Sequence, residues 1–140
     1  MGNVQEITNT KSELVVAVVG SRSIQGDQTT AKRLGCYLAH LRPALVISGG
    51  AAGADQLAAG WARANEVPLL EVRPDYAAHG ASAPHMRNAE IVRQADLVLL
   101  LWDGKSRGTL SAARAAARLG RRCKWLLHAP PAGPAGGLEL

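Results

Sequence analysis

The stretch VISGGAAGADQLAAGWA, residues 46–62, joins a short apolar run to an alanine-rich segment through Gly49, Gly50, Gly53 and Asp55. A short apolar run that ends in turn residues is typical of a buried strand, and alanine favours a helix. Glycine has no Cβ, so it lets the backbone turn sharply and approach a neighbour closely. The stretch therefore predicts a strand, a tight loop and a helix, with a loop backbone that comes close to another group.

The same alternation runs through most of the chain. Apolar runs predict strands at 14–19, 44–47, 69–72, 97–101 and 122–127, and helical stretches lie between them at 27–41, 54–65, 84–94 and 109–119. Parallel neighbours need a crossover helix, so this order predicts a parallel sheet with helices on both faces. We expect α/β architecture: a single Rossmann-like three-layer α/β/α domain with a five-stranded parallel sheet in the order 3-2-1-4-5. In such sheets ligands bind beyond the C-terminal strand ends, here between the first and fourth strands.

Length and composition indicate one domain. The chain has 140 residues, of which 47% are hydrophobic and only 4% aromatic, so the core should be aliphatic. Residues 1–12 are polar and without periodicity, which predicts a flexible N-terminal arm. Residues 129–140 are rich in Pro and Gly, which predicts a disordered tail. The folded domain is expected to cover residues 13–128.

Charge and cysteine usage limit the classes of function. A net charge of +5 indicates an anionic partner. The densest basic cluster, residues 114–124, fits a solvated helix face as well, and no aromatic residues alternate with its charges as a base-stacking surface requires. Cys36 and Cys123 have neither zinc-ligand nor redox spacing and are predicted to be buried free thiols. No apolar run is long enough to span a membrane, so we expect a cytoplasmic protein that does not bind a membrane.

Unusual residues follow all four strands that end at the expected ligand edge. The first loop reads GSRS, the second SGGAAGAD, the third RPDYAAHGASAPHMRN and the fourth WDGKSRGT. The candidate ligand- and phosphate-binding residues are Gly20, Ser21, Arg22, Ser48, Gly49, Gly50, Gly53, Asp55, Arg87, Asn88, Asp103, Ser106, Gly108 and Thr109.

The glycine loop is the strongest of these signals. Its backbone N–H groups and the N-terminus of the following helix favour a phosphate. The spacing is neither GxGxxG nor GxxxxGK[ST], which argues against a standard dinucleotide fingerprint and against a P-loop. Asp55 could cap the helix or accept a hydrogen bond from a ligand hydroxyl. The fourth loop, with Ser106, Gly108 and Thr109, is a candidate for a second anion site.

The third loop is longer than the usual connection of about 4 to 6 residues, which suggests function. Arg87 and Asn88 follow it at the start of a helix, where a cation and an amide can face one pocket. His79 and His85 lack a Cys or carboxylate at ligand spacing. We therefore predict no metal site and no cofactor.

With these residues in place, the sequence resembles the SLOG superfamily, a Rossmann-like group that includes the DNA-processing Smf/DprA proteins and the LOG phosphoribohydrolases. The YspA/YpsA-related branch of bacteria and phages is the most similar. The resemblance rests on VVGSRS, ISGGAAGADQLAAGWA, VPLLEVRPDY, HMRNAEIVRQAD and DGKSRGTLSAARAA, which span about residues 14–127. It implies a nucleotide or nucleotide-derived ligand, including a signal molecule, and a homo-oligomer. The alanine-rich segments 58–62 and 112–117 would allow two helices to approach each other closely.

The resemblance also raises the question of catalysis. In the LOG enzymes an arginine and the glutamate of PGGxGTxxE support cleavage of the N-glycosidic bond of a nucleoside 5′-monophosphate. Arg87 matches the arginine, but the glutamate position is Ala112 and the PGG is replaced by residues 104–106. Because this cleavage needs a carboxylate, we favour binding over catalysis. An N-glycosidase or phosphoribohydrolase with candidate catalytic residues Arg87, Asp55 and Asp103, or with Asp75, is the alternative. Nucleic-acid binding and carriage of the molybdenum cofactor have less support from the residues.

Overall fold

The computed structural model describes residues 13–24, 28–127 and 138–139 of the chain. The strands are β1 (Val15–Gly20), β2 (Leu45–Ser48), β3 (Leu69–Glu71), β4 (Leu97–Leu101), β5 (Arg122–Trp125) and β6 (Leu138–Glu139). The helices are α2 (Gln28–Leu41), α3 (Ala54–Ala64), α4 (Tyr76–His79), α5 (Ala83–Gln94) and α6 (Arg107–Leu119), and a 3-10 turn, η1 (Gly80–Ser82), joins α4 to α5.

The strands form one parallel sheet in the order β3-β2-β1-β4-β5-β6. Its first five strands confirm the predicted order, and β1 pairs with both β2 and β4, so the order reverses between β1 and β4 as expected. The two-residue strand β6 pairs with β5, so at these two positions the structure has a strand where the sequence predicts a disordered tail. Residues 1–12 and the rest of 129–140 lie outside the described residues.

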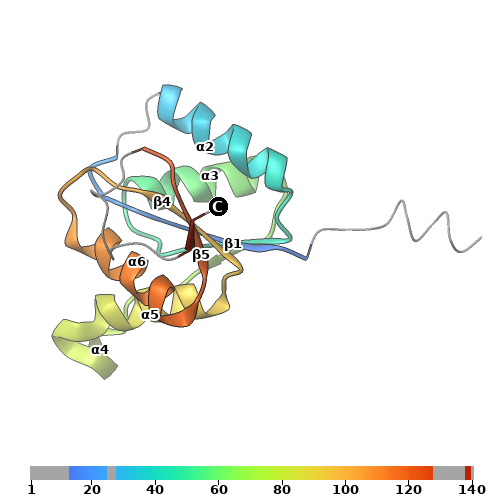
Figure 1. The fold of residues 1–140 in the computed structure, drawn as a ribbon. Coiled ribbons are helices and arrows are strands. Elements are labelled where there is room, and N and C mark those ends of the chain that lie inside the picture. Colours follow the sequence, from blue (N-terminus) through green and yellow to red (C-terminus); the bar gives the residue numbers. More distant parts are fainter. Residues whose placement is uncertain (1–12, 25–27, 128–137, 140) are drawn as a thin grey trace, which may run out of the picture.

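Two helices cover each face of the sheet (Figure 1), as the three-layer prediction requires. Alternate strand residues point to opposite faces, so β1 sends Val16 and Val18 to one core and Ala17 and Val19 to the other. Helices α2 and α3 close the first core, and α5 and α6 close the second. Because the alanines of α3 and α6 lie at the sheet, these helices pack close to it.

Those alanines bear on the predicted oligomer. Ala58, Ala59 and Ala62 of α3 are fully buried inside the chain, and so are Ala112, Ala113 and Ala116 of α6. The faces that could have joined two copies are therefore used within one copy. A homo-oligomer stays a prediction, and these alanines no longer support it.

Local signals explain where α6 begins and ends. The Ser106 side chain accepts a hydrogen bond from the Thr109 N–H, so the helix begins at Arg107, two residues before the predicted start. Gly120 ends it in the left-handed conformation, as a glycine after a helix commonly does. The predicted long third loop holds α4 and η1, which the sequence reading missed.

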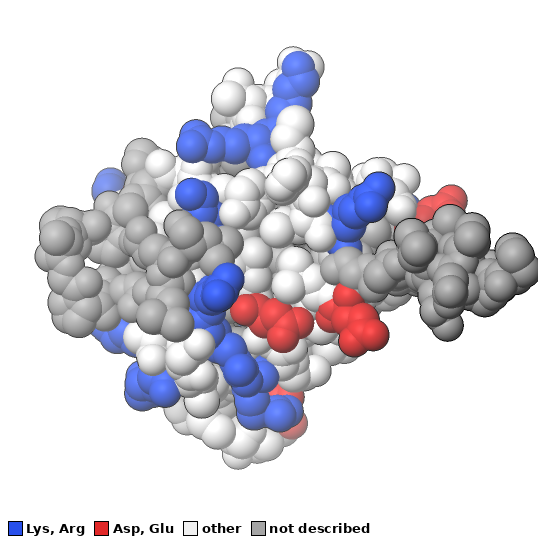
Figure 2. All heavy atoms as spheres, turned by 45° about the vertical axis from the view of Figure 1, so that its right-hand side comes forward, with Lys and Arg blue, Asp and Glu red and all other residues white. Residues whose placement is uncertain are grey.

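The two cysteines and the basic cluster can now be compared with the predictions. Cys123 is buried as predicted, but Cys36 is exposed on α2, so the prediction of two buried thiols was wrong at that residue. Arg121 donates to the main-chain oxygens of Val92 and Arg93 and so satisfies the C-terminal end of α5. On the face shown in Figure 2, Lys and Arg side chains lie in the upper part, at the height of α2 in Figure 1, and in the lower part, at the height of α5 and α6.

Candidate functional site

A pocket of about 420 Å³ opens at the C-terminal ends of the strands, beside the loops that follow the paired strands β1 and β4. It lies where the fold predicts a ligand, and its size is in the range of small-molecule sites. The predicted site residues that line it are Gly20, Arg22, Gly49, Asp55, Arg87, Asn88, Asp103, Ser106, Gly108 and Thr109. The structure thus brings together residues from all four loops.

Four predicted site residues do not line this pocket. Ser21 and Ser48 are buried beneath it, and the Ser48 hydroxyl accepts from the Gly50 N–H at 3.4 Å. Gly50 faces an adjoining hollow. Gly53 packs against the first loop, because a Cβ there would lie 2.4 Å from the Ser21 carbonyl oxygen. These four residues shape the loops and do not face the pocket.

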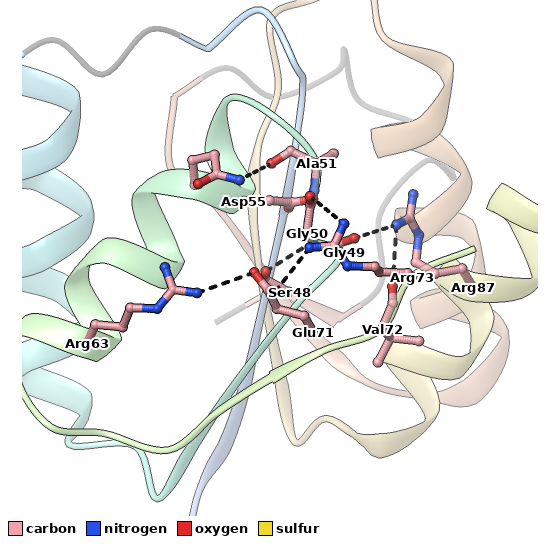
Figure 3. Close-up of polar contacts among 11 residues, drawn as sticks. Ser48, Gly49, Gly50, Ala51, Asp55, Arg63, Glu71, Val72, Arg73 and Arg87 are labelled. Atoms are coloured by element: carbon pink, nitrogen blue, oxygen red, sulfur yellow. Dashed lines mark hydrogen bonds and ion pairs between the residues drawn. The ribbon is translucent and has the colours of Figure 1, made fainter. Parts of the chain in front are cut away.

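The glycine loop encloses a carboxylate of its own. The Asp55 side chain accepts a hydrogen bond from the Ala51 N–H at 3.0 Å, and the Ala54 N–H donates to the Ser21 carbonyl. Asp55 is therefore the anion that this loop holds in the present structure (Figure 3). The predicted phosphate cradle is partly filled by the protein, which leaves less of the loop for a ligand.

Asp55 and Arg87 form the charged centre of the pocket. Burial raises the pKa of Asp55, and the Ala51 N–H and the Arg87 charge oppose that rise. Burial lowers the pKa of Arg87, while Asp55 acts against it. Arg87 donates through Nη1 to the Gly49 carbonyl at 2.9 Å, so the guanidinium is held against the glycine loop (Figure 3). A Cβ on Gly49 would lie 2.6 Å from Nη1, which explains the glycine.

Asn88 fixes the neighbouring wall. Its Oδ1 accepts from Arg87 Nε at 3.0 Å, and its Nδ2 donates to the Gly108 carbonyl at 3.2 Å. The residue is 5% exposed. Asn88 thus connects the arginine on α5 to the first turn of α6 and positions both.

Asp103 organises the loop between β4 and α6. One carboxylate oxygen accepts from the N–H groups of Lys105 and Ser106 at 2.8 Å each, and the other accepts from the Ser23 hydroxyl at 2.5 Å. These bonds, led by the one from Ser23, hold the pKa of Asp103 well below its ordinary value. With its lone pairs engaged, Asp103 shapes the loop and is a weak candidate for a catalytic base.

Ser21 joins the first and fourth loops from below. Its hydroxyl accepts from the Asp103 N–H at 3.0 Å and lies 3.4 Å from the Thr109 hydroxyl. The side chain predicted to contact a phosphate is therefore engaged within the protein, because two strand-end loops meet over it.

Part of the pocket wall was not predicted from the sequence. Val19, Ser23, Ala51, Pro84 and Ile91 also line it. Pro84, Arg87, Asn88 and Ile91 follow helical spacing on one face of α5, so the periodicity around Arg87 was a usable signal. Ser23 could have been predicted as a lining residue because it belongs to the GSRS loop, which was already expected at the ligand edge.

Other predicted candidates lie elsewhere. Asp75 caps α4 by accepting from the Ala78 N–H, and it does not line the pocket. His85 Nδ1 lies 2.8 Å from the Ser111 hydroxyl, on the outer side of α5 and α6.

The described residues hold no group of three His, Cys, Asp or Glu side chains placed for a metal ion. No helix in the described ranges has the length and apolar character needed to cross a membrane.

The fold and the place of the pocket define a Rossmann-like domain with a strand-edge site. The model of the YspA, cpYpsA-related SLOG family matches residues 14–79. Gene 61 protein of Mycobacterium phage D29 is 37% identical over 114 residues, which cover 75% of this chain and 90% of that protein. The chain belongs to the YspA, cpYpsA-related SLOG family, which confirms the expected resemblance.

Solved structures agree on the fold. DNA processing protein A from Helicobacter pylori, described for its single-stranded DNA binding mode, superposes with a TM-score of 0.63 at 20% identity over 81% of this chain. The match covers 65% of the chain in that structure. The X-ray structure of TM1055 gives a TM-score of 0.62 at 24% identity, over 79% of this chain and 72% of the other. At these identities the likeness concerns the fold alone.

Proposed function

We propose that the protein binds a nucleotide or nucleotide-derived small molecule in the strand-edge pocket. The observation that carries the proposal is that the first turn of α6 and the guanidinium of Arg87 line the same pocket. The N-terminus of a 13-residue helix attracts an anion through its dipole, while the Thr109 N–H of its first turn is capped by the Ser106 side chain. A guanidinium adds charge-assisted hydrogen bonds to a phosphate. The phosphate is thus assigned to the α6 side.

The glycine loop takes a second role in this proposal. Since its N–H groups already hold Asp55, the loop contributes an acceptor, and Asp55 is placed to receive a hydrogen bond from a ligand hydroxyl such as a ribose hydroxyl. The small side chains of the loop leave the space that the ligand occupies. A sugar between a carboxylate and a phosphate-binding helix is the arrangement expected for a nucleotide.

Cleavage of an N-glycosidic bond is the second candidate, and Asp55 is the observation that favours it. The residue is 6% exposed and lines the pocket, and its pKa is raised, as is common for groups in acid–base catalysis. Ala112, at the position of the LOG glutamate, is fully buried in the core between α5, α6 and the sheet. A hydrolase of this family would therefore rely on Asp55.

Calorimetric titration with AMP and GMP tests the proposal. Micromolar binding requires about 8 kcal/mol, which three or four charge-assisted hydrogen bonds reach only near the upper end of their range of about 1.5–3 kcal/mol each, so we expect micromolar to millimolar affinity. Arg87→Gln should weaken binding about tenfold or more. Arg93→Gln, on the same helix but outside the pocket and paired with Glu90, should not change it.

The same samples separate binding from cleavage. Chromatography after incubation detects free base, and its release would support the hydrolase, provided that Asp55→Asn abolishes it. Melting curves of the variants establish that each one folds. If neither AMP nor GMP produces a measurable heat of binding at millimolar concentration, the proposed function is wrong.

A further inference from the structure

A second hollow adjoins the pocket on the far side of the glycine loop. It has a volume of about 280 Å³, and Arg22, Arg73 and Arg87 line it together with Gly50 and Pro74. The pocket and the hollow share Arg22, Gly49, Ala51 and Arg87, so they lie side by side. The lining of the hollow contains three guanidinium groups and no carboxylate. Its charge is therefore one-sided, unlike that of the pocket, where Asp55 and Asp103 offset the arginines.

Gly50 makes room for the Arg73 guanidinium. The residue has φ +75°, and a Cβ there would lie 3.1–3.3 Å from the Cζ and nitrogen atoms of Arg73. Arg73 Nη1 donates to the Gly50 carbonyl at 3.4 Å. Figure 3 shows the two arginines, Arg73 and Arg87, approaching the loop from the β3 side and from α5. The positive φ favours glycine at this position, and the exposed Arg73 side chain lies directly against it.

The arginines carry charge that the protein neutralises only in part. Arg73 is paired with Glu71 at 3.4 Å, but its side chain is 67% exposed, so this ion pair is weak. Arg63 of α3 also contacts Glu71, at 4.0 Å (Figure 3). Glu71 would therefore remain paired with Arg63 if the Arg73 side chain moved to bind a ligand. An anion in the hollow would also reduce the repulsion between Arg22 and Arg87.

We propose that this hollow is a second anion subsite, and that the ligand is a nucleotide with a second phosphate, either a nucleoside diphosphate or a pyrophosphate-linked nucleotide. The proposal rests on the proposed function for the first phosphate. The first phosphate lies at the α6 side of the pocket, and the second reaches Arg73 across the glycine loop. Arg22 and Arg87, which line both spaces, contact the ligand between them.

Titrations with AMP, ADP and ADP-ribose test the subsite. We expect ADP or ADP-ribose to bind about fivefold to tenfold more tightly than AMP, a modest gain because Arg73 is largely exposed. A preference for ADP indicates a terminal phosphate, and one for ADP-ribose an internal pyrophosphate. Arg73→Gln should reduce the preference below about twofold and leave AMP binding unchanged. Arg63→Gln, which also removes a partner of Glu71 but lies outside the hollow, should preserve it.

Two results would overturn the subsite: equal binding of all three nucleotides by the wild-type protein, or a preference that persists in Arg73→Gln. If no nucleotide binds, the proposed function fails and inorganic pyrophosphate becomes the probe. Pyrophosphate binding that disappears in Arg73→Gln would then support the subsite by itself. Absent or unaltered pyrophosphate binding would reject it.

Discussion

Asp55 and Asp103 face the same pocket and experience opposite environments. Asp55 is buried, with few donors to compensate for the loss of water, so its pKa is raised. Asp103 accepts from one hydroxyl and two N–H groups of its own loop, so its pKa is lowered. The ionised form of Asp55 therefore opposes folding, whereas that of Asp103 favours it. A carboxylate kept at a cost in stability is more consistent with a functional role than with a structural one.

Thermal melts of Asp55→Asn and Asp103→Asn between pH 3 and 8 measure this difference. At pH 7, Asp55→Asn should melt at or above the wild-type temperature, because the amide removes a buried charge. That advantage should disappear below about pH 4, near the ordinary pKa of Asp, where the carboxyl is protonated in both states.

Asp103→Asn should behave in the opposite way. At pH 7 it should melt about 3 °C lower, the shift that a loss of roughly 1 kcal/mol produces in a chain of this size. Stability from a lowered pKa is present above the unfolded value and decreases as the pH falls through the folded one, so the deficit should shrink in acid. If both variants melted below the wild-type temperature at pH 7, the opposite effects of the two ionised carboxylates on folding would be refuted.

At the scale of elements, the site depends on loops that lie against each other. Gly20 and Gly53 allow the first two loops and the start of α3 to meet, since a Cβ on Gly20 would lie 2.4 Å from the Ala54 Cβ. Gly53 has φ +78° and faces the carbonyls of Ser21 and Arg22. Gly53 of the glycine loop, together with Gly20, thus serves contact between loops.

Two glycine-to-alanine variants of the same segment separate these roles. Gly53→Ala combines a disfavoured φ with a clash against fixed backbone and should lower the free energy of unfolding by about 2–4 kcal/mol. Gly60→Ala, in the interior of α3 with no atom within 4 Å of the added Cβ, should raise it by about 0.5–1 kcal/mol. Urea unfolding measures both. A mild effect at Gly53 would mean that the loops do not pack as described.

At the scale of the molecule, the net charge of +5 and the basic outer face of α6 raise the question of nucleic acid. Lys105, Arg107, Arg114 and Arg118 line a groove there, with no carboxylate among its lining residues. Such a surface attracts any polyanion without reading its sequence. The strand-edge pocket is different, because its charges are partly buried and less screened by salt.

Salt dependence distinguishes the two surfaces. Binding of a 20-nucleotide single strand should be weak and should fall roughly tenfold or more between 50 and 200 mM salt. Nucleotide binding should change less than about threefold over the same range. The double variant Arg114→Gln/Arg118→Gln should weaken binding of the oligonucleotide and leave binding of the nucleotide unchanged. Tight strand binding that survives salt would favour a nucleic-acid function instead.

The sequence predicted the strands, most of the helices and the meeting of four loops at one edge, because these follow from local patterns. Buried strands show as apolar runs, crossovers force the strands to be parallel, and parallel strands end at the same edge. Gly49 and Arg87 could accordingly be assigned to one pocket before their contact was seen. Short elements without a hydrophobic pattern, such as α4, could not be read in this way.

By itself the sequence determined the fold, the family and the edge of the sheet that holds the site, since all three depend on periodicity and on the order of motifs. Only the tertiary structure decided which side chains face the pocket. Ser21 and Ser48 are engaged in hydrogen bonds of the loops, Asp55 accepts a hydrogen bond from the glycine loop, and Arg73, which follows β3, lines the adjoining hollow. The physical reason is that hydrogen-bond partners and burial arise between segments distant in sequence, and no local pattern encodes which polar group each donor will meet.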